Sequence, residues 1–265
     1  MIDGALPSLR CPLCEQSLTR CERTLRCVRG HGFDLAKQGY ANLTAGRMPH
    51  SGDTVAMIAD RAAFLTAGHY DFIADAMTGY AAGGLILDAG TGTGHYLARL
   101  LDAAPDAVGL GVDVSKPALR RAARSHHRAA AILADLWRPL PVADASADVI
   151  LNVFAPRNGA EFHRVLRPGG VLVVVTPAPD HLAELIAAHG LIRVDPDKAA
   201  RVEESLGAHF KPADTTTLRR TLHLTTPETH TLIGMTPSAH HAPAPPNAPP
   251  PPVTAAVTVT AYHPA

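Results

Sequence analysis

Three cysteines and one histidine near the start of the chain constrain its fold more than any other feature. Cys11, Cys14, Cys27 and His31 follow the pattern C-x2-C-x12-C-x3-H. Two ligand pairs with this separation are typical of a tetrahedral zinc site filled by thiolates and an imidazole. The spacing therefore predicts a structural zinc module, in which the bound metal stabilises a segment that has almost no core of its own.

The remaining cysteine leaves one alternative open. All four cysteines lie before residue 28, where they fit metal binding better than disulfides. Cys21 lies between the two ligand pairs, and we expect a packing or solvent-facing thiol there. In the alternative, Cys21 is the fourth ligand and His31 is an ordinary surface histidine. The first assignment is favoured because Cys27-Val-Arg-Gly-His31 makes a good second pair.

Composition limits what the rest of the chain can be. It has 265 residues, 46% of them hydrophobic, with 24 basic and 24 acidic side chains. That is enough for one main core beside a small module. The zero net charge argues against a wholly basic nucleic-acid coat, so any RNA contact must use local patches. No apolar run is long enough to span a membrane and no signal-peptide pattern is present, so we expect a cytoplasmic protein with no membrane partner.

Strand and helix signals organise the chain after the zinc module. We divide it into the zinc module (1–44), a polar linker with two lead-in helices (45–82) and a main domain (83–265). In the main domain, short apolar strands alternate with helices, which predicts an α/β fold with a mostly parallel sheet covered on both faces. A late antiparallel pair is expected at 218–224 and 253–262, joined by an exposed Pro-rich connection. The other expected strands are 85–88, 108–113, 131–134, 149–152 and 171–176, and the expected helices are 96–103, 117–125, 160–166 and 181–189.

A glycine-rich turn follows the first strand of the main domain. The sequence LILDAGTGTG at 85–94 places Asp88 at the strand end, followed by Gly90, Gly92 and Gly94. Glycines let the backbone pass close to a ligand, and the helix that follows offers N–H groups to it. Asp88 has a second interpretation, as a strand-end acid that only holds the loop.

Two further acids complete a nucleotide-binding pattern. Asp113 ends the next strand, where a carboxylate can accept both hydroxyls of a ribose. Asp135 follows the third strand, where it is a candidate partner for an adenine amino group. With the RPGG turn at 167–170, these features are typical of a class I (Rossmann-like) S-adenosylmethionine-dependent methyltransferase. The rival is an NAD(P)-binding Rossmann enzyme, whose glycines follow G-x-G-x-x-G instead of the G-x-G-x-G present here.

A longer pattern joins the two modules. It comprises CPLC at 11–14, HGFD at 31–34, KQGYANL at 37–43, GD at 52–53, AGHY at 67–70 and NVFAPRN at 152–158. Across most of its length the chain resembles the 23S rRNA guanine-N1 methyltransferases of the RlmA/TlrB type. The NVFAPRN segment is closer to the actinobacterial branch associated with tylosin (macrolide) resistance. After Met235-Thr-Pro, where family members carry a Trp, this chain has Ser-Ala-His-His and then the proline run.

The resemblance implies an enzyme that transfers a methyl group from S-adenosylmethionine to N1 of a guanosine in a domain II hairpin of 23S rRNA. It implies that a zinc ribbon helps to hold that hairpin. It also implies cofactor contacts at Tyr70, Gly92, Thr93 and His181. A homodimer and a role in macrolide resistance are compatible with this resemblance.

The residues that handle the target base stay open at this point. Guanine N1 carries a proton, and the sequence indicates no clear base to remove it. Asn152 is a candidate to hydrogen-bond the base edge and Phe154 to stack on it, because their loop follows the fourth strand at the carboxyl edge of the sheet. Both residues also fit ordinary strand-end packing. The target must be flipped out or already unpaired to reach such a site.

Two other functions remain as rivals. The first is a small-molecule methyltransferase whose zinc module serves oligomerisation, which predicts methylation without RNA. The second is a non-catalytic RNA-binding protein with a relic cofactor site, which predicts no turnover of S-adenosylmethionine. The complete glycine turn, Asp113 and the RPGG turn disfavour this second rival.

Overall fold

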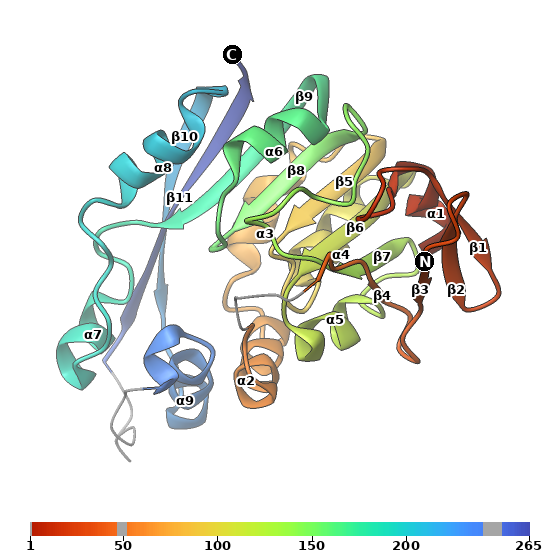
Figure 1. Cartoon of the computed structure of the whole chain (residues 1–265). Coiled ribbons are helices and arrows are strands. Elements are labelled where there is room, and N and C mark those ends of the chain that lie inside the picture. Colours follow the sequence, from red (N-terminus) through yellow and green to blue (C-terminus); the bar gives the residue numbers. More distant parts are fainter. Residues whose placement is uncertain (1, 47–51, 241–250) are drawn as a thin grey trace.

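A mixed eight-stranded sheet forms the centre of the protein, for which a computed structural model describes residues 2–46, 52–240 and 251–265. Its strands are β4 (Ala41–Asn42), β5 (Gly84–Ala89), β6 (Ala107–Asp113), β7 (Ala129–Leu133), β8 (Ala147–Val153), β9 (Leu166–Pro177), β10 (Phe210–Leu222) and β11 (Val253–Pro264). They lie in the order β10-β11-β9-β8-β5-β6-β7-β4 (Figure 1). The strands from β9 to β4 are parallel, whereas β11 pairs antiparallel with both β9 and β10.

The sheet forms because its inner strands are predominantly apolar. Side chains alternate between two faces, so that Leu85 and Leu87 of β5 join one buried cluster while Ile86 joins the other. Strands buried on both faces need such continuous apolar runs. The predicted strands and the late antiparallel pair are confirmed, as is the α/β fold class.

Helices cover both faces of this sheet. One face carries α2 (Val55–Thr66), α3 (Asp71–Thr78), α4 (His95–Ala103), α7 (Ala183–His189) and α9 (Thr226–Gly234), and α5 (Lys116–Ala122) extends this layer over β7. The opposite face carries α6 (Gly159–Val165), α8 (Lys198–Leu206) and the short α1 (Ile2–Ala5). The predicted turn between the two lead-in helices is present, because Gly68 adopts a φ of +82° after α2.

The cysteine-rich segment lies at one end of the sheet (Figure 1). After the 3-10 turn η1 (Leu6–Ser8), the strands β1 (Leu18–Cys21), β2 (Thr24–Cys27) and β3 (Gly32–Asp34) form a separate antiparallel sheet. β4 lies within the predicted zinc module, yet it pairs with β7 in the central sheet. The zinc segment thus has a continuous hydrogen-bonded link to the main sheet. The proposed division at residues 44 and 82 stays a prediction.

The last third of the chain holds elements that the sequence pattern does not announce. The helices α8 and α9 and the 3-10 turn η2 (Pro237–His240) fall in segments for which no element was predicted. β10 begins at Phe210 rather than at residue 218, and its residues from Lys211 to Thr221 are exposed or half-buried on both faces. Residues 47–51 of the linker and 243–250 of the Pro-rich run lie outside the described residues.

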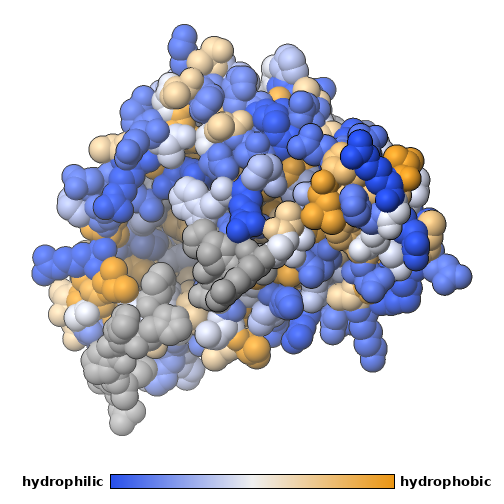
Figure 2. Space-filling model, viewed as in Figure 1, coloured by the Kyte–Doolittle hydropathy of each residue, from blue (hydrophilic) through white to orange (hydrophobic). Residues whose placement is uncertain are grey.

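The surface is mostly hydrophilic on the face that Figure 2 shows, with apolar residues in small groups. Among the described residues, no helix combines the length and apolar character that crossing a lipid bilayer requires.

Candidate functional site

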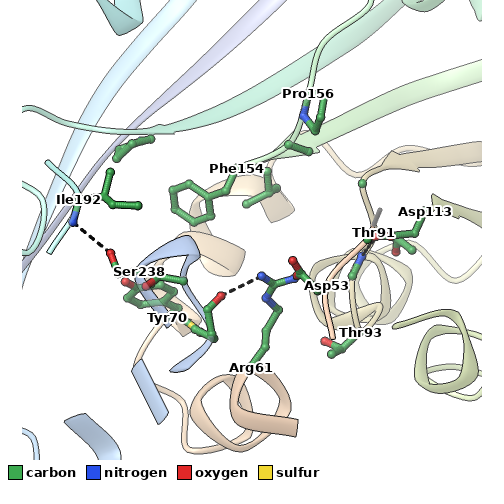
Figure 3. Close-up of a pocket in the computed structure, with 18 of the residues that line it drawn as sticks. Asp53, Arg61, Tyr70, Thr91, Thr93, Asp113, Phe154, Pro156, Ile192 and Ser238 are labelled. Atoms are coloured by element: carbon green, nitrogen blue, oxygen red, sulfur yellow. Dashed lines mark hydrogen bonds and ion pairs between the residues drawn. The ribbon is translucent and has the colours of Figure 1, made fainter. Parts of the chain in front are cut away.

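A cavity of about 750 Å³ opens at the carboxyl ends of the parallel strands. Its lining includes Gly90 after β5. It also includes Asp113 at the end of β6 and Phe154 directly after β8 (Figure 3). The chain continues from β5 to β6 on one side and returns to β8 on the other, so this edge is the topological switch point. Open α/β sheets bind their ligands in the crevice at such a point.

The glycine loop is held on the strand beside it. The N–H groups of Gly90 and Thr91 both donate to the carbonyl oxygen of Val112 on β6, at 2.9 and 3.0 Å. Gly90, Gly92 and Gly94 have φ values of +90°, +54° and +81°, which other residues rarely adopt. A Cβ on Gly90 would also lie 2.3 Å from Cβ of Ala155, so only glycine fits there. Gly90, Gly92 and Thr93 line the cavity.

The acids at the ends of β5 and β6, Asp88 and Asp113, each accept a hydrogen bond from this loop. Oδ2 of the buried Asp88 accepts the hydroxyl of Thr91 at 2.7 Å, and burial raises the pKa of Asp88 to about 7. Asp113 accepts the N–H of Gly92 at 2.8 Å and that of Ser115 at 2.7 Å. Burial raises the pKa of Asp113, against the effect of these N–H donors. Asp113 faces the cavity, whereas Asp88 lies behind the loop, which supports the loop-holding interpretation of Asp88.

Asp135, in the loop after β7, contributes to the same cavity. Its side chain is buried and accepts the N–H of Trp137 at 3.0 Å, which fixes the turn that follows the strand. Thus Asp113 and Asp135, the predicted partners of a ribose and an adenine, line the same cavity.

Tyr70 and His181 form a hydrogen-bonded pair on the opposite side. Nδ1 of His181 accepts the N–H of Ala256 at 3.1 Å, so in the neutral ring Nε2 carries the proton and donates to the hydroxyl oxygen of Tyr70 at 3.3 Å. Burial lowers the pKa of His181 to about 4, so the ring is neutral near pH 7. The Tyr70 O–H can therefore donate to another acceptor, such as a carboxylate in the cavity.

The loop after β8 presents one aromatic side chain to the cavity and buries its neighbour. Phe154 is 43% exposed, has a φ of +52°, and its ring centroid lies 6.4 Å from that of Tyr70 and 6.0 Å from that of His181. Asn152 is fully buried, and its Nδ2 donates to the carbonyls of Ala89 at 3.1 Å and of Pro156 at 2.8 Å. This geometry favours a positioning role for Asn152 over the base contact predicted for it.

Several cavity residues escaped the sequence analysis as functional candidates. Arg61 of α2 forms an ion pair with Asp53 at 2.5 Å and donates to the carbonyl of Met235 at 3.0 Å (Figure 3). Ile192 lies on another wall and donates its N–H to Oγ of Ser238 at 3.1 Å. The GD pair at 52–53 was a usable signal for Asp53, whereas Arg61 and Ile192 become neighbours of the site only through the tertiary fold.

A second cluster has the geometry of a metal centre. The ligand atoms of Cys11, Cys14, Cys27 and His31 all lie within 4.8 Å of one another. Sγ of Cys14 and Cys27 are 3.7 Å apart, and Nδ1 of His31 is 3.4 Å from Sγ of both Cys11 and Cys27. A zinc tetrahedron with bonds of about 2.3 Å to sulfur and 2.0 Å to nitrogen gives separations of about 3.8 and 3.5 Å. The four residues therefore fit Zn²⁺, whereas Cys21 is exposed and outside the cluster.

Family models match both parts of the chain. A zinc-ribbon model described as "RlmA, N-terminal" covers residues 9–49, and one described as "Methyltransferase domain" covers residues 86–170. In structure, the chain is similar to the methyltransferase-like protein in a complex with the Trm112 methyltransferase activator of Haloferax volcanii. The TM-score is 0.53 at 18% identity, over 81% of this chain and 99% of that one. The protein is thus an S-adenosylmethionine-dependent methyltransferase with an N-terminal zinc ribbon, and its cofactors are S-adenosylmethionine and Zn²⁺.

Proteins of similar sequence indicate which family of methyltransferases the chain belongs to. A Micromonospora griseorubida protein, provisionally named a 23S rRNA (guanine-N1)-methyltransferase, is 53% identical over 97% of this chain and 95% of its own length. The 23S rRNA (guanine(748)-N1)-methyltransferase of Streptomyces fradiae is 48% identical over 88% of this chain and 86% of its own length. The chain belongs to the 23S rRNA (guanine-N1)-methyltransferase family, as the sequence resemblance predicted.

Proposed function

We propose that this enzyme methylates N1 of a guanosine in a domain II hairpin of 23S rRNA. The observation that carries the proposal is one cavity with a nucleotide-binding glycine loop on one side and an exposed aromatic ring, Phe154, on another. The similarity to a relative named for guanine 748 supports that position as the target.

Cofactor binding rests on residues from four segments. Asp113 is oriented by the N–H groups of Gly92 and Ser115, and its carboxylate oxygens have further lone pairs for ribose hydroxyls. The O–H of Tyr70, kept as a donor by the neutral His181, suits the carboxylate of the amino acid part. When bound, S-adenosylmethionine supplies a methyl group on a positively charged sulfur.

Positioning of the base is the main catalytic contribution that the geometry supports. Asn152 ties Ala89, at the end of β5, to Pro156 in the loop that carries Phe154. The left-handed backbone of Phe154 is a conformation that costs about 1–3 kcal/mol and is found where a site requires it. A flipped guanine stacked on this ring would present N1 toward the donor methyl, and fixed alignment can supply much of the rate.

The wider biological role is also proposed on the family resemblance. We assign RNA docking to the zinc ribbon, which lies at the end of the sheet where β4 meets β7. Methylation in the domain II hairpin, near the peptide exit tunnel, fits a contribution to macrolide resistance. An rRNA substrate implies work in the cytoplasm, and a homodimer is compatible with the exposed edge strand β10.

The test is methyl transfer from labelled S-adenosylmethionine to unmodified 23S rRNA, mapped by primer extension, which stalls at N1-methylguanine. We expect a single new stop in the domain II hairpin, and no stop on a matched RNA with adenosine at that position. Methylation of small molecules without RNA would favour the first rival. Cofactor binding with no transfer to free rRNA or to ribosomal subunits would favour the non-catalytic rival.

A further inference from the structure

The outer wall of the cavity is unusually apolar for an exposed surface. Among the described residues, six large hydrophobic side chains are exposed, and three of these line this one cavity. They are Trp137, Phe154 and Ile192. Exposed apolar groups that gather in a concave site mark a binding surface, whereas scattered ones need no explanation.

Ile192 is held in its exposed position by its neighbours. Its side chain is 56% exposed, yet its N–H is bonded to the buried Ser238 and the adjacent Leu191 is only 8% exposed. Figure 3 shows Ile192 and Phe154 at the same cavity, on segments that are far apart in the sequence. Burying Leu191 and anchoring the backbone keep an apolar side chain on the wall opposite the glycine loop.

Two positively charged side chains lie beside these apolar residues. Arg193 and Lys198 line the same cavity, and no carboxylate of the described residues lies within 4.0 Å of either charged group. The nearby Asp195 is instead paired with Arg201 at 3.1 Å. Burial and the positive charge of Arg157 lower the pKa of Lys198, and the negative charge of Asp195 only partly opposes them. A bound anion would offset the repulsion from Arg157 and favour the charged form of Lys198.

Apolar side chains beside unpaired cations match the chemistry of a nucleotide, whose base is flat and apolar on its faces and whose phosphate is anionic. We propose that residues 191–198, between α7 and α8, form the outer half of the target-nucleotide pocket. Ile192 packs on the guanine face opposite Phe154, and Lys198 contacts the phosphate next to the target guanosine. This inference rests on the proposed rRNA function and names the residues that hold its substrate.

The Ile192 contact is tested with Ile192→Ala and the conservative Ile192→Leu, assayed on a domain II hairpin RNA. We expect Ile192→Ala to lower kcat/KM about tenfold, because it removes most of the apolar contact with the base, while Ile192→Leu stays within about twofold of the wild type. The Kd for S-adenosylhomocysteine, measured by calorimetry, should be unchanged in both. Equal loss of cofactor affinity in Ile192→Ala would mean a structural role and overturn the inference.

The phosphate contact is tested with Lys198→Gln, with Lys198→Arg as rescue and Lys211→Gln as a charge-matched control on β10, outside the cavity lining. We expect Lys198→Gln to raise KM for RNA about tenfold with kcat nearly unchanged. It should also reduce the slope of log affinity against log salt by about 0.7–0.9, the value for one phosphate. A slope equal to that of Lys211→Gln would overturn the phosphate contact.

The wild-type enzyme separates the two levels of the proposal. If wild-type protein transfers no methyl to rRNA, the proposed function fails before any variant is compared. If wild-type protein methylates the hairpin and both Ile192→Ala and Lys198→Gln match its kcat, KM and salt slope, only the pocket assignment fails.

Discussion

At the scale of single residues, Asp88 acts behind the glycine loop through a hydrogen bond. Its carboxyl accepts the Thr91 hydroxyl at 2.7 Å, and burial raises its pKa to about 7. A group with that pKa is only partly ionised at neutral pH, so a full negative charge is not what holds the loop. What the loop requires at this position is a buried acceptor of the right size.

Replacing Asp88 tests this directly. Asparagine keeps an acceptor for Thr91, so Asp88→Asn should keep the Kd for S-adenosylhomocysteine within about threefold of the wild type, whereas Asp88→Ala leaves a buried hydroxyl unpaired and should weaken binding about tenfold. Isothermal titration calorimetry at pH 7.5 measures both. Equal losses in the two variants would show that the charge is needed.

His181 gives a pH-dependent prediction. Burial lowers its pKa from 6.5 to about 4, so between these values the unfolded chain binds the proton more readily than the folded protein. Its contribution to stability is complete above about pH 6.5 and is lost as the pH falls toward 4. The free energy of unfolding of the wild type should fall by about 2 kcal/mol more than that of His181→Gln between pH 7.5 and 5. Urea unfolding measures this difference, and parallel pH profiles would contradict it.

Residue roles were only partly predictable from sequence. The sequence pattern identified Asp113 and Phe154 as site candidates and the family resemblance added Tyr70, and all three line the cavity. The pattern could not show which of Asn152 and Phe154 faces the cavity, because both residues lie at the end of the same strand. Only the three-dimensional register shows that Asn152 points back to Ala89 while the left-handed backbone of Phe154 turns its ring outward.

At the scale of elements, the N-terminal segment that contains the zinc ribbon is joined to the central sheet by strand pairing and packing. β4 follows the last zinc ligand and pairs with β7, and Gly4 of α1 lies against Val108 of β6. Loss of zinc should therefore disturb the edge of the methyltransferase sheet as well as the ribbon.

Zinc removal tests this coupling. We expect Cys27→Ser to lose bound zinc and to lower the unfolding temperature by about 5 °C or more, because structural zinc supplies much of the folding free energy of small modules. Cys21→Ser, outside the ligand cluster, should keep one zinc per chain and the wild-type unfolding temperature. Metal analysis and differential scanning fluorimetry measure both, and zinc loss in Cys21→Ser would revive the alternative ligand set.

The link between α2 and the end of α9 gives another element-scale prediction. Arg61→Ala removes the ion pair to Asp53 and the bond to Met235, and it should cost about 1 kcal/mol of stability and weaken S-adenosylhomocysteine binding about fivefold. Arg99→Ala is the matched control, because its pair with Asp75 is more exposed and lies outside the cavity lining. Equal effects of the two variants on cofactor binding would contradict a role of Arg61 in shaping the cofactor site.

Element prediction succeeded where burial imposes a pattern. The inner strands are apolar on both faces, and their sequence shows it. β10 was found only from residue 218 because its first half, with Lys211 and Asp214, is exposed on both faces and has no alternation to detect. The start of α9 carried a usable signal, since Thr225 and Glu228 form a capping box.

At the scale of the whole molecule, the fold brings the zinc ribbon, the cofactor site and the proposed base pocket into one chain. Spacing predicted the zinc cluster, and the glycine turn with the strand-end acids and the RPGG turn predicted the class of methyltransferase. The outer wall of the pocket was not predictable, because residues 191–198 carry no motif and reach the site only by the path of the chain between α7 and α8.

The most direct test of the central claim is nucleoside analysis of 23S rRNA after reaction with the purified enzyme and S-adenosylmethionine. Liquid chromatography with mass spectrometry should find about one 1-methylguanosine per rRNA, and none when Phe154→Ala is used with its cofactor affinity intact. A different methylated nucleoside, or undiminished 1-methylguanosine with Phe154→Ala, would contradict the account of how this cavity holds its substrate.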